Sequence, residues 1–250
     1  MEEGKLYHDV EIKDQLAASQ PFGDWVGKIK DLEPAIAGVT EKVLFSGAEL
    51  KRRQIAAGYD IEALETILHP MVEDAKEAIA SMGDDTPAAV LSERYRPLSH
   101  FFRQNFSQVT NPPIDSLREH RVMSLRTRFG NLKNVLDQTG AQTEILTLES
   151  PVVTNARFAE MLKYLGDTAT EIDCTFAADG GTLRERLDEI RAAAEQAVRA
   201  GANHIILTDM AQDEARVPMP MILATSAVHS WLARKGLRTF CSINVRSAEC

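Results

Sequence analysis

The feature that most constrains the fold is an alternation of strand-like and helix-like segments that begins after residue 140. Candidate strands cover residues 143–148, 171–176, 204–208 and 239–245. Candidate helices lie between them, over residues 156–165, 183–199 and 219–235. Strands that are separated by crossover helices pair in parallel, because a tight turn cannot join parallel neighbours. The alternation therefore predicts an α/β fold with about four parallel βα units.

The helix over residues 183–199 is the best defined of these elements. Thr182 and Glu185 have the spacing of a capping box, in which each side chain accepts a hydrogen bond from the backbone N–H of the other residue. Apolar side chains recur every three or four residues along the helix, and Gly201 follows as a stop signal. In residues 171–176 apolar and polar residues alternate instead, which is the period of a strand.

Residues 1–140 lack this alternation and carry shorter helical patterns. We expect helical segments over residues 11–19, 60–80, 98–106 and 115–128. Pro70 should divide the second of these, because proline lacks an N–H and disfavours helical geometry at His69. Gly130 should cap the last one. The chain is thus expected to consist of a linker and helical part over residues 1–140 and a βα part over residues 141–250.

Composition and charge narrow the function classes. The 250 residues are 44% hydrophobic and 26% charged with a formal net charge of -9, which is an ordinary globular composition and argues against binding of nucleic acid by the whole chain. No apolar run reaches the roughly 18–20 residues of a membrane span, and the acidic start does not resemble a leader. Three widely spaced cysteines suit a reducing compartment. We therefore expect a cytoplasmic protein.

One segment departs from the overall acidity. Residues 91–135 contain eight basic and three acidic residues, a local balance of +5 that leaves -14 for the rest of the chain. One interpretation is a site for a phosphate, a carboxylate or an acidic neighbouring domain. The other is a set of solvated helix faces whose arginines pair with the acidic remainder. The sequence leaves both open.

No arrangement of nucleophile, base or metal ligands is recognisable. The six histidines never fall at His-x-x-x-His spacing, the cysteines form no Cys-x-x-Cys pair, and Gly-rich phosphate loops are absent. His229, on a helix that is apolar nearly all round, is expected to be a core histidine. Asp209 ends a candidate strand, where it is either a catalytic group or a cap for the next turn. Residues 81–85 form either a metal or anion loop or a plain turn.

Several motifs together resemble the large chain of glutamate synthase, between its glutaminase and flavin domains. The most specific motif is Gln108-Val109-Thr110-Asn111-Pro112-Pro113-Ile114-Asp115, and a second is Ser81-Met82-Gly83-Asp84-Asp85-Thr86-Pro87. Further matches lie at residues 149–155, 227–229 and 236–239, and residues 20–25 resemble the segment that leaves the glutaminase domain. The resemblance covers nearly all of the chain in order. It departs at Ser116, where the family usually has another proline.

The resemblance implies a part of an enzyme that hydrolyses glutamine, channels the ammonia internally and adds it reductively to 2-oxoglutarate. The family uses FMN and an iron–sulfur cluster, with electrons from a pyridine-nucleotide-linked small subunit or from ferredoxin. Its glutaminase nucleophile and cofactor residues belong to other parts of the parent chain. We therefore expect no catalytic, cofactor-binding or metal-binding residue in this segment, and no activity of the isolated segment. Its expected partners are the glutaminase and FMN domains of the same chain.

The resemblance also implies the role of the segment. The central domain of the family is similar to the flavin barrel, holds no cofactor, spaces the catalytic domains and forms part of the ammonia tunnel wall. From their places in the two motifs, Met82, Thr110 and Asn111 are expected to line the tunnel. In the alternative interpretation, Met82 fills space in the core and Thr110 forms a turn. Four strands give only a partial TIM-like barrel, so residues 239–245 should lie at an unpaired edge of a piece of a longer protein.

Two other functions stay open at this point. One is a free-standing βα enzyme with a site at the strand ends near Asp209 and Thr175. The other is a polyanion-binding module that uses the basic segment, in particular Arg118 and Arg121.

Overall fold

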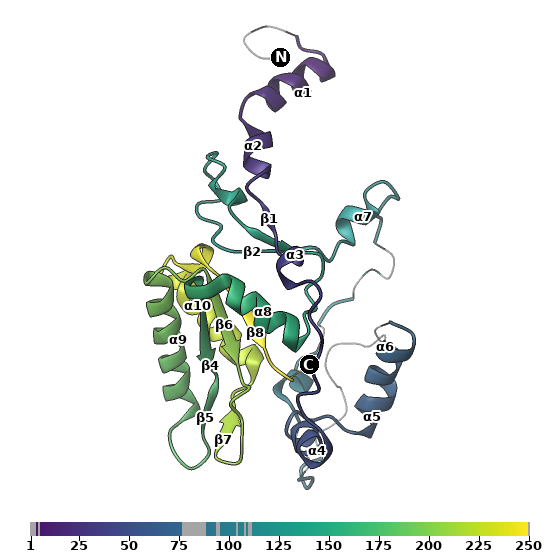
Figure 1. Cartoon of the computed structure of the whole chain (residues 1–250), viewed down its shortest axis with the longest axis vertical. Coiled ribbons are helices and arrows are strands. Elements are labelled where there is room, and N and C mark those ends of the chain that lie inside the picture. The colour runs from purple at the N-terminus through teal and green to yellow at the C-terminus, as the bar shows by residue number, and fades with distance from the viewer. Residues whose placement is uncertain are drawn as a thin grey trace.

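The central element is a three-stranded parallel sheet in the second half of the chain. The computed structural model describes residues 4, 6–76, 89–93, 96–103, 105–107, 109 and 112–249. The strands lie in the order β4 (Ala169–Asp173), β6 (His204–Thr208) and β8 (Ser242–Arg246). Helices α9 (Leu183–Arg199) and α10 (Met221–Arg234) lie in the connections between them (Figure 1). The predicted α/β fold class is confirmed.

Different helices cover the two faces of this sheet, because side chains alternate along each strand. Ile205 and Leu207 of β6 belong to one apolar cluster with side chains of α9 and α10. Ile206 belongs to a second cluster with side chains of α8 (Asn155–Leu165). These three β6 residues are all fully buried. The middle strand therefore lies between two helical layers.

A second, mixed sheet contains the strand predicted over residues 143–148. Its order is β1 (Lys30–Asp31), β3 (Leu146–Leu148), β2 (Thr127–Phe129), with β1 parallel and β2 antiparallel to β3. The expectation that this strand is the first of four in one parallel sheet is therefore wrong in its pairing. The reason is that β3 uses both of its edges for residues from the first part of the chain.

The strand predicted over residues 171–176 is divided in two. β4 ends at Asp173, and β5 (Thr175–Ala177) pairs antiparallel with β7 (Arg216–Pro218) as a separate two-stranded sheet. The break lies at Cys174, whose N–H donates to the carbonyl of Thr208 at 2.7 Å and whose carbonyl accepts from Met219. Cys174 is thus bonded both to the last residue of β6 and to the residue that follows β7. At this point the chain passes from the parallel sheet into the sheet of β5 and β7.

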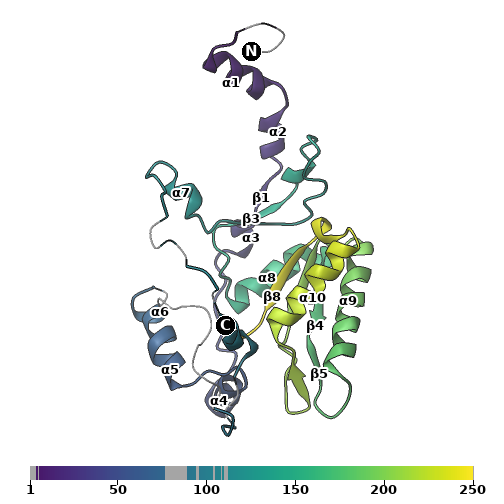
Figure 2. The ribbon, with the colours of Figure 1, turned by 180° about the vertical axis from the view of Figure 1, so that it is seen from behind.

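The first part of the chain contains short helices with little shared core. They are α1 (Asp9–Ala18), α2 (Phe22–Val26), α3 (Glu33–Ile36), α4 (Gly47–Ala56), α5 (Ile61–Ala63), a π turn (Leu64–Leu68), α6 (His69–Glu73) and α7 (Glu119–Val122). Short 3₁₀ turns cover Leu98–Phe101, Ala141–Thr143, Gly166–Thr168 and Arg238–Phe240. Figures 1 and 2 show α1 and α2 projecting from the body as an arm. Among these described helices, only α3, through Ile36, buries a side chain in the core.

The predicted division at Pro70 is wrong. The backbone is helical without interruption from Ile61 to Glu73, and His69 keeps helical angles (φ -61°, ψ -50°). The π turn just before Pro70 explains this difference, because a wider turn changes the backbone pairing where proline withholds an N–H. Pro70 is the second residue of α6 and directly follows the π turn and His69.

The two helices predicted before residue 130 are also largely wrong. Leu98–Phe101 is a single 3₁₀ turn, and within 115–128 only Glu119–Val122 is α-helical. Residues 127–129 pair with β3, so tertiary pairing overrides the helical pattern there. Gly130 follows a strand at φ +136°, rather than capping a helix.

The parallel sheet stays open. Among the described strands β8 pairs with β6 alone, so the predicted unpaired edge is confirmed for Ser242–Arg246, and the sheet is consistent with a partial barrel. It is wrong for residues 239–240, which belong to a 3₁₀ turn, and the Thr239 carbonyl accepts from the Leu132 N–H at 2.9 Å. The predicted division of the chain into two parts near residue 140 stays a prediction. The sheet β1–β3–β2 crosses it, because β1 and β2 come before residue 140 and β3 comes after it. In the part of the chain that the structure describes, no helix is long and apolar enough to cross a membrane.

Candidate functional site

Polar side chains gather at the carboxyl end of the parallel sheet, where open α/β sheets bind their ligands. β4 ends at Asp173, and Thr175 follows one residue later at the beginning of β5. Asp209 follows the end of β6, and Ser247 follows the end of β8. Arg216 reaches the same place from β7. These residues form the candidate site, and their contacts decide what it can do.

Asp173 is surrounded by donors. Its carboxylate accepts from Arg216 Nη2 at 2.5 Å, from the Thr175 hydroxyl at 2.9 Å and from the Thr175 N–H at 2.9 Å. Arg216 Nε donates to Thr175 Oγ1 at 2.7 Å, which closes the network. Thr175 is fully buried. The three side chains therefore satisfy one another where β4 passes into β5.

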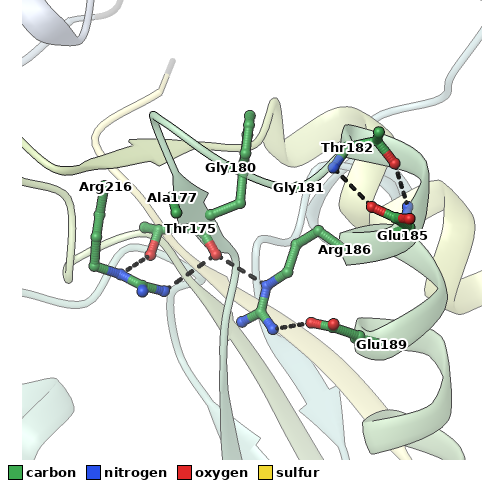
Figure 3. A pocket seen from close by; sticks show the side chains of 10 residues that line it. Thr175, Ala177, Gly180, Gly181, Thr182, Glu185, Arg186, Glu189 and Arg216 are labelled. Carbon is green, nitrogen blue, oxygen red and sulfur yellow. Dashed lines mark hydrogen bonds and ion pairs between the residues drawn. The ribbon is translucent and has the colours of Figure 1, made fainter.

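Arg186 of α9 holds the same strand ends from the other side (Figure 3). Its Nε donates to the Thr175 carbonyl at 2.9 Å, its Nη2 to the Asp173 carbonyl at 2.8 Å, and its Nη1 to Glu189 at 2.6 Å. A pocket of about 250 Å³ lies beside it, bordered by Gly180, Gly181 and both arginines. All three Arg186 nitrogens and two of the three Arg216 nitrogens already donate to the protein itself.

Asp209 differs from Asp173, because only one of its two carboxylate oxygens has a hydrogen-bond partner among the described residues. The Ser247 hydroxyl donates to its Oδ2 at 2.5 Å, while Oδ1 is buried without a hydrogen-bond partner among the described residues. Burial raises the pKa of the Asp209 carboxyl. Nearby, Glu249 Oε2 accepts from the Met221 N–H at 2.5 Å, at the first residue of α10. A carboxylate of the chain thus occupies a helix N-terminus of the kind that binds phosphates in other folds.

The described residues do not fit the cofactors of the implied family. Among them, no group of three or more His, Cys, Asp or Glu side chains could hold a metal ion. Burial raises the pKa of the Cys174 thiol to about 11 and also raises the pKa of Cys241, which disfavours the thiolate needed for iron–sulfur ligation. The helix N-terminus that could receive a flavin phosphate already contacts Glu249. We therefore assign no chemical step to these strand ends.

Sequence reasoning found part of this site. Asp209 and Thr175 were predicted as strand-end residues and do lie at strand ends, whereas Arg186 and Arg216 were not identified. Arg216 is 41 positions from Thr175, so no local pattern indicates their contact. The spacing of Asp173 and Thr175 at a strand end was an available signal. The predicted tunnel residues Met82, Thr110 and Asn111, and the loop 81–85, lie outside the described residues.

The expectation for His229 is wrong. The side chain is exposed, and its Nδ1 accepts from Arg238 Nε at 3.0 Å. The buried histidine is His204 on β6, which packs edge-on against Phe129 with ring centroids 5.4 Å apart. Burial lowers the pKa of His204 to about 4. Its Nδ1 is buried without a partner among the described residues, so the imidazole is kept neutral between the two sheets.

The basic segment is partly ion-paired, both internally and with the acidic remainder. Arg118 contacts Asp115 of the same segment at 2.8 Å, whereas Arg126 contacts Glu149 at 3.3 Å and Lys133 contacts Glu144 at 2.5 Å outside it. These pairs agree with the interpretation of solvated, ion-paired faces. Arg121 and Arg128 are exposed and have no ion-pair partner among the described residues.

Comparison with known proteins identifies the family. A family model described as the glutamate synthase central domain matches residues 52–250. The chain belongs to the glutamate synthase central domain family. The predicted resemblance is thereby confirmed, whereas the free-standing enzyme and the polyanion-binding module stay untested predictions.

The similar proteins are large chains of glutamate synthases. The chain is 58% identical over 254 residues to the glutamate synthase [NADPH] large chain of Azospirillum brasilense, covering all of this chain and 17% of that protein. It is 35% identical to the corresponding large chain of Bacillus subtilis (strain 168) and 37% identical to ferredoxin-dependent glutamate synthase 2 of Synechocystis sp., in each case with 16% of the relative covered. The chain thus spans about one sixth of the length of these relatives.

Proposed function

We propose that this segment works as the central part of a glutamate synthase large chain, between a glutaminase domain and an FMN domain. In that enzyme glutamine is hydrolysed, and the ammonia is added reductively to 2-oxoglutarate to give glutamate. The observation that carries the proposal is the match to large chains from both NADPH-dependent and ferredoxin-dependent enzymes along 99–100% of this chain.

The proposed role of the segment itself is structural and channelling. The engagement of Asp173, Arg186 and Arg216 with one another and with the backbone supports a spacer, because their donors and acceptors are used within the fold. FMN, the iron–sulfur cluster and the electron donor, whether a small subunit or ferredoxin, are proposed to act outside this segment. We place the complete enzyme in the cytoplasm.

Within this role, Met82, Thr110 and Asn111 are proposed to line the ammonia passage. A small hydroxyl and a flexible thioether can border a narrow path for a neutral molecule. Pro112 and Pro113 stiffen the chain beside Thr110, because each proline ring fixes its own φ.

The test is Thr110→Trp in the complete large chain, with Val109→Trp as the matched control at a neighbouring side chain that is 71% exposed. We expect Thr110→Trp to keep glutamine hydrolysis but to lower 2-oxoglutarate consumption, so that ammonia escapes into solution. The control should keep the two rates equal. Equal rates in Thr110→Trp would show that Thr110 does not line the passage.

A further inference from the structure

A small cavity lies beside Asp209 at the carboxyl end of the parallel sheet. Its volume of about 30 Å³ is enough for one or two water molecules, since one requires roughly 10–15 Å³. The end of α4, the residues after β6 and β8, and the turn before α10 border it. Segments from four places in this chain thus meet around a space that only a small molecule or ion can fill.

The feature that points to a ligand is an unsatisfied oxygen of Asp209. This residue borders the cavity and is only 4% exposed. Ser247 donates to its Oδ2 at 2.5 Å, whereas Oδ1 is buried without a hydrogen-bond partner among the described residues. A buried carboxylate oxygen without a partner is costly, so a proton, a water molecule or a cation is needed to compensate it.

The surroundings of the cavity carry an excess of negative charge. None of the described residues that border it is a lysine, an arginine or a histidine, and Glu249 adds a second carboxylate. Glu249 accepts from the Met221 N–H at 2.5 Å, so the start of α10 balances part of its charge. Burial raises the pKa of the Asp209 carboxyl more than the charge of Arg53 lowers it, and Arg53 is itself ion-paired within α4. The charge of Asp209 is therefore the one left without compensation.

Size and charge together favour a monovalent cation as the ligand. Carboxylate and amide oxygens are typical ligands of hard cations. Mg²⁺ retains several water molecules in a near-octahedral arrangement, for which a cavity of about 30 Å³ has no room. A neutral water molecule would donate to Oδ1 but would leave the buried charge unbalanced. A cation about as large as a water molecule, such as K⁺ or NH₄⁺, both fits the cavity and balances the charge.

We propose that this cavity binds one monovalent cation, with Asp209 Oδ1 as its charged ligand and the side chains of Glu249 and Gln212 as further oxygen donors. The bound cation links the residues after β6 to those after β8 and so holds these strand ends together. It takes part in no step of glutamate formation. The proposal therefore stands or falls separately from the proposed function.

The first test locates the cation in crystals of the complete large chain, in which the neighbouring domains are present. Tl⁺ replaces K⁺ at oxygen sites and is found by its anomalous scattering, so the probe is thallium(I) acetate. We expect an anomalous peak in the cavity beside Asp209. Asp209→Asn should remove most of its height, whereas Asp179→Asn, at an exposed carboxylate that does not border the cavity, should keep it. Of K⁺ and NH₄⁺, the one that displaces Tl⁺ at the lower concentration is the preferred cation.

The second test measures binding in solution, through the midpoint of thermal unfolding of the complete chain. A ligand that binds the folded state raises this midpoint. KCl or NH₄Cl should therefore raise it above its value in choline chloride of equal ionic strength, because choline is too large for the cavity. Asp209→Asn should lose at least about nine tenths of this difference, as expected for a tenfold or greater loss of affinity.

Three results would overturn the proposal. One is a wild-type cavity that holds a water molecule or a side chain of another domain and gives no anomalous peak, a result that does not depend on whether the variant folds. Another is a peak of full height in Asp209→Asn. The third is a peak without a cation-specific shift of the unfolding midpoint, which would mean binding at crystal concentration only.

Discussion

Residues 1–140 and residues 141–249 differ in how much core they supply. Of the buried apolar residues that the structure describes, only Leu32, Ile36 and Phe129 come from the first region. The second region contributes the sandwiched strand β6 and the buried faces of α8, α9 and α10. Burial of apolar surface dominates folding stability, so the second region should set the free energy of unfolding of the whole chain.

The first region instead presents exposed apolar side chains on short helices. Ile61, Val72 and Leu117 are each more than 70% exposed. Helices this short are marginal on their own and need a covering surface. The two regions thus differ in where their apolar side chains lie, buried around β6 in the second region and exposed on short helices in the first.

The largest difference between the regions should come from one pair of matched substitutions. Leu207→Ala removes a fully buried side chain of β6 and should lower the free energy of unfolding by about 2–5 kcal/mol. Leu136→Ala, at a side chain that is 87% exposed in the first region, should change it by less than about 0.5 kcal/mol. Urea denaturation followed by circular dichroism measures both. Equal effects would contradict the comparison.

The next effect depends on pH and tests the junction between the regions, where His204 meets Phe129. Burial lowers the pKa of His204 from 6.5 to about 4. Between these pH values the unfolded chain binds a proton at this histidine, whereas the folded chain does not. The free energy of unfolding therefore has its full value, as far as His204 is concerned, above pH 6.5, and it falls by roughly 3 kcal/mol in all as the pH falls towards 4.

Denaturation curves from pH 7 to pH 4 check this dependence. His204→Gln has no imidazole and should lose that part of the pH slope, whereas His229→Gln, at an exposed histidine, should keep it. A wild-type slope unchanged in His204→Gln would show that the junction does not keep the imidazole neutral.

A smaller effect is expected at the strand ends. Arg216→Met removes the donors to Asp173 and Thr175 and should cost about 1–2 kcal/mol, since the ion pair is partly exposed and screened. Arg118→Met in the first region breaks a pair with Asp115 whose side chains are 79% and 47% exposed, and should cost less than about 0.5 kcal/mol. Thermal unfolding of the two variants compares them. The comparison fails if Arg118→Met is the more destabilised variant.

Prediction from sequence succeeded where local pattern and tertiary burial agree. The helix over residues 183–199 and the strand over residues 204–208 have the predicted bounds, because capping, periodicity and burial favour the same structure. It failed at residues 127–129, where pairing with β3 overrides a helical pattern. It also failed for His229, which lies beside the buried Val228 on α10 but faces solvent.

The site was less predictable than the fold. Arg216 meets Asp173 across 43 positions, and the antiparallel pairing of β5 with β7 brings them together. No periodicity in the sequence encodes that pairing.

The family, in contrast, was predictable from motifs such as Val109-Thr110-Asn111-Pro112-Pro113. A motif of this kind is specific for one family, whereas the overall composition is shared by many globular proteins.

The most direct test of the central claim replaces the matching segment of the Azospirillum brasilense large chain, to which this chain is 58% identical, with residues 1–250. Glutamine hydrolysis and 2-oxoglutarate consumption are then measured in the same reaction. If this segment is the central part of a glutamate synthase, the exchanged enzyme should form glutamate and keep the two rates equal. A folded, cofactor-loaded enzyme that hydrolyses glutamine without matching consumption of 2-oxoglutarate would contradict it.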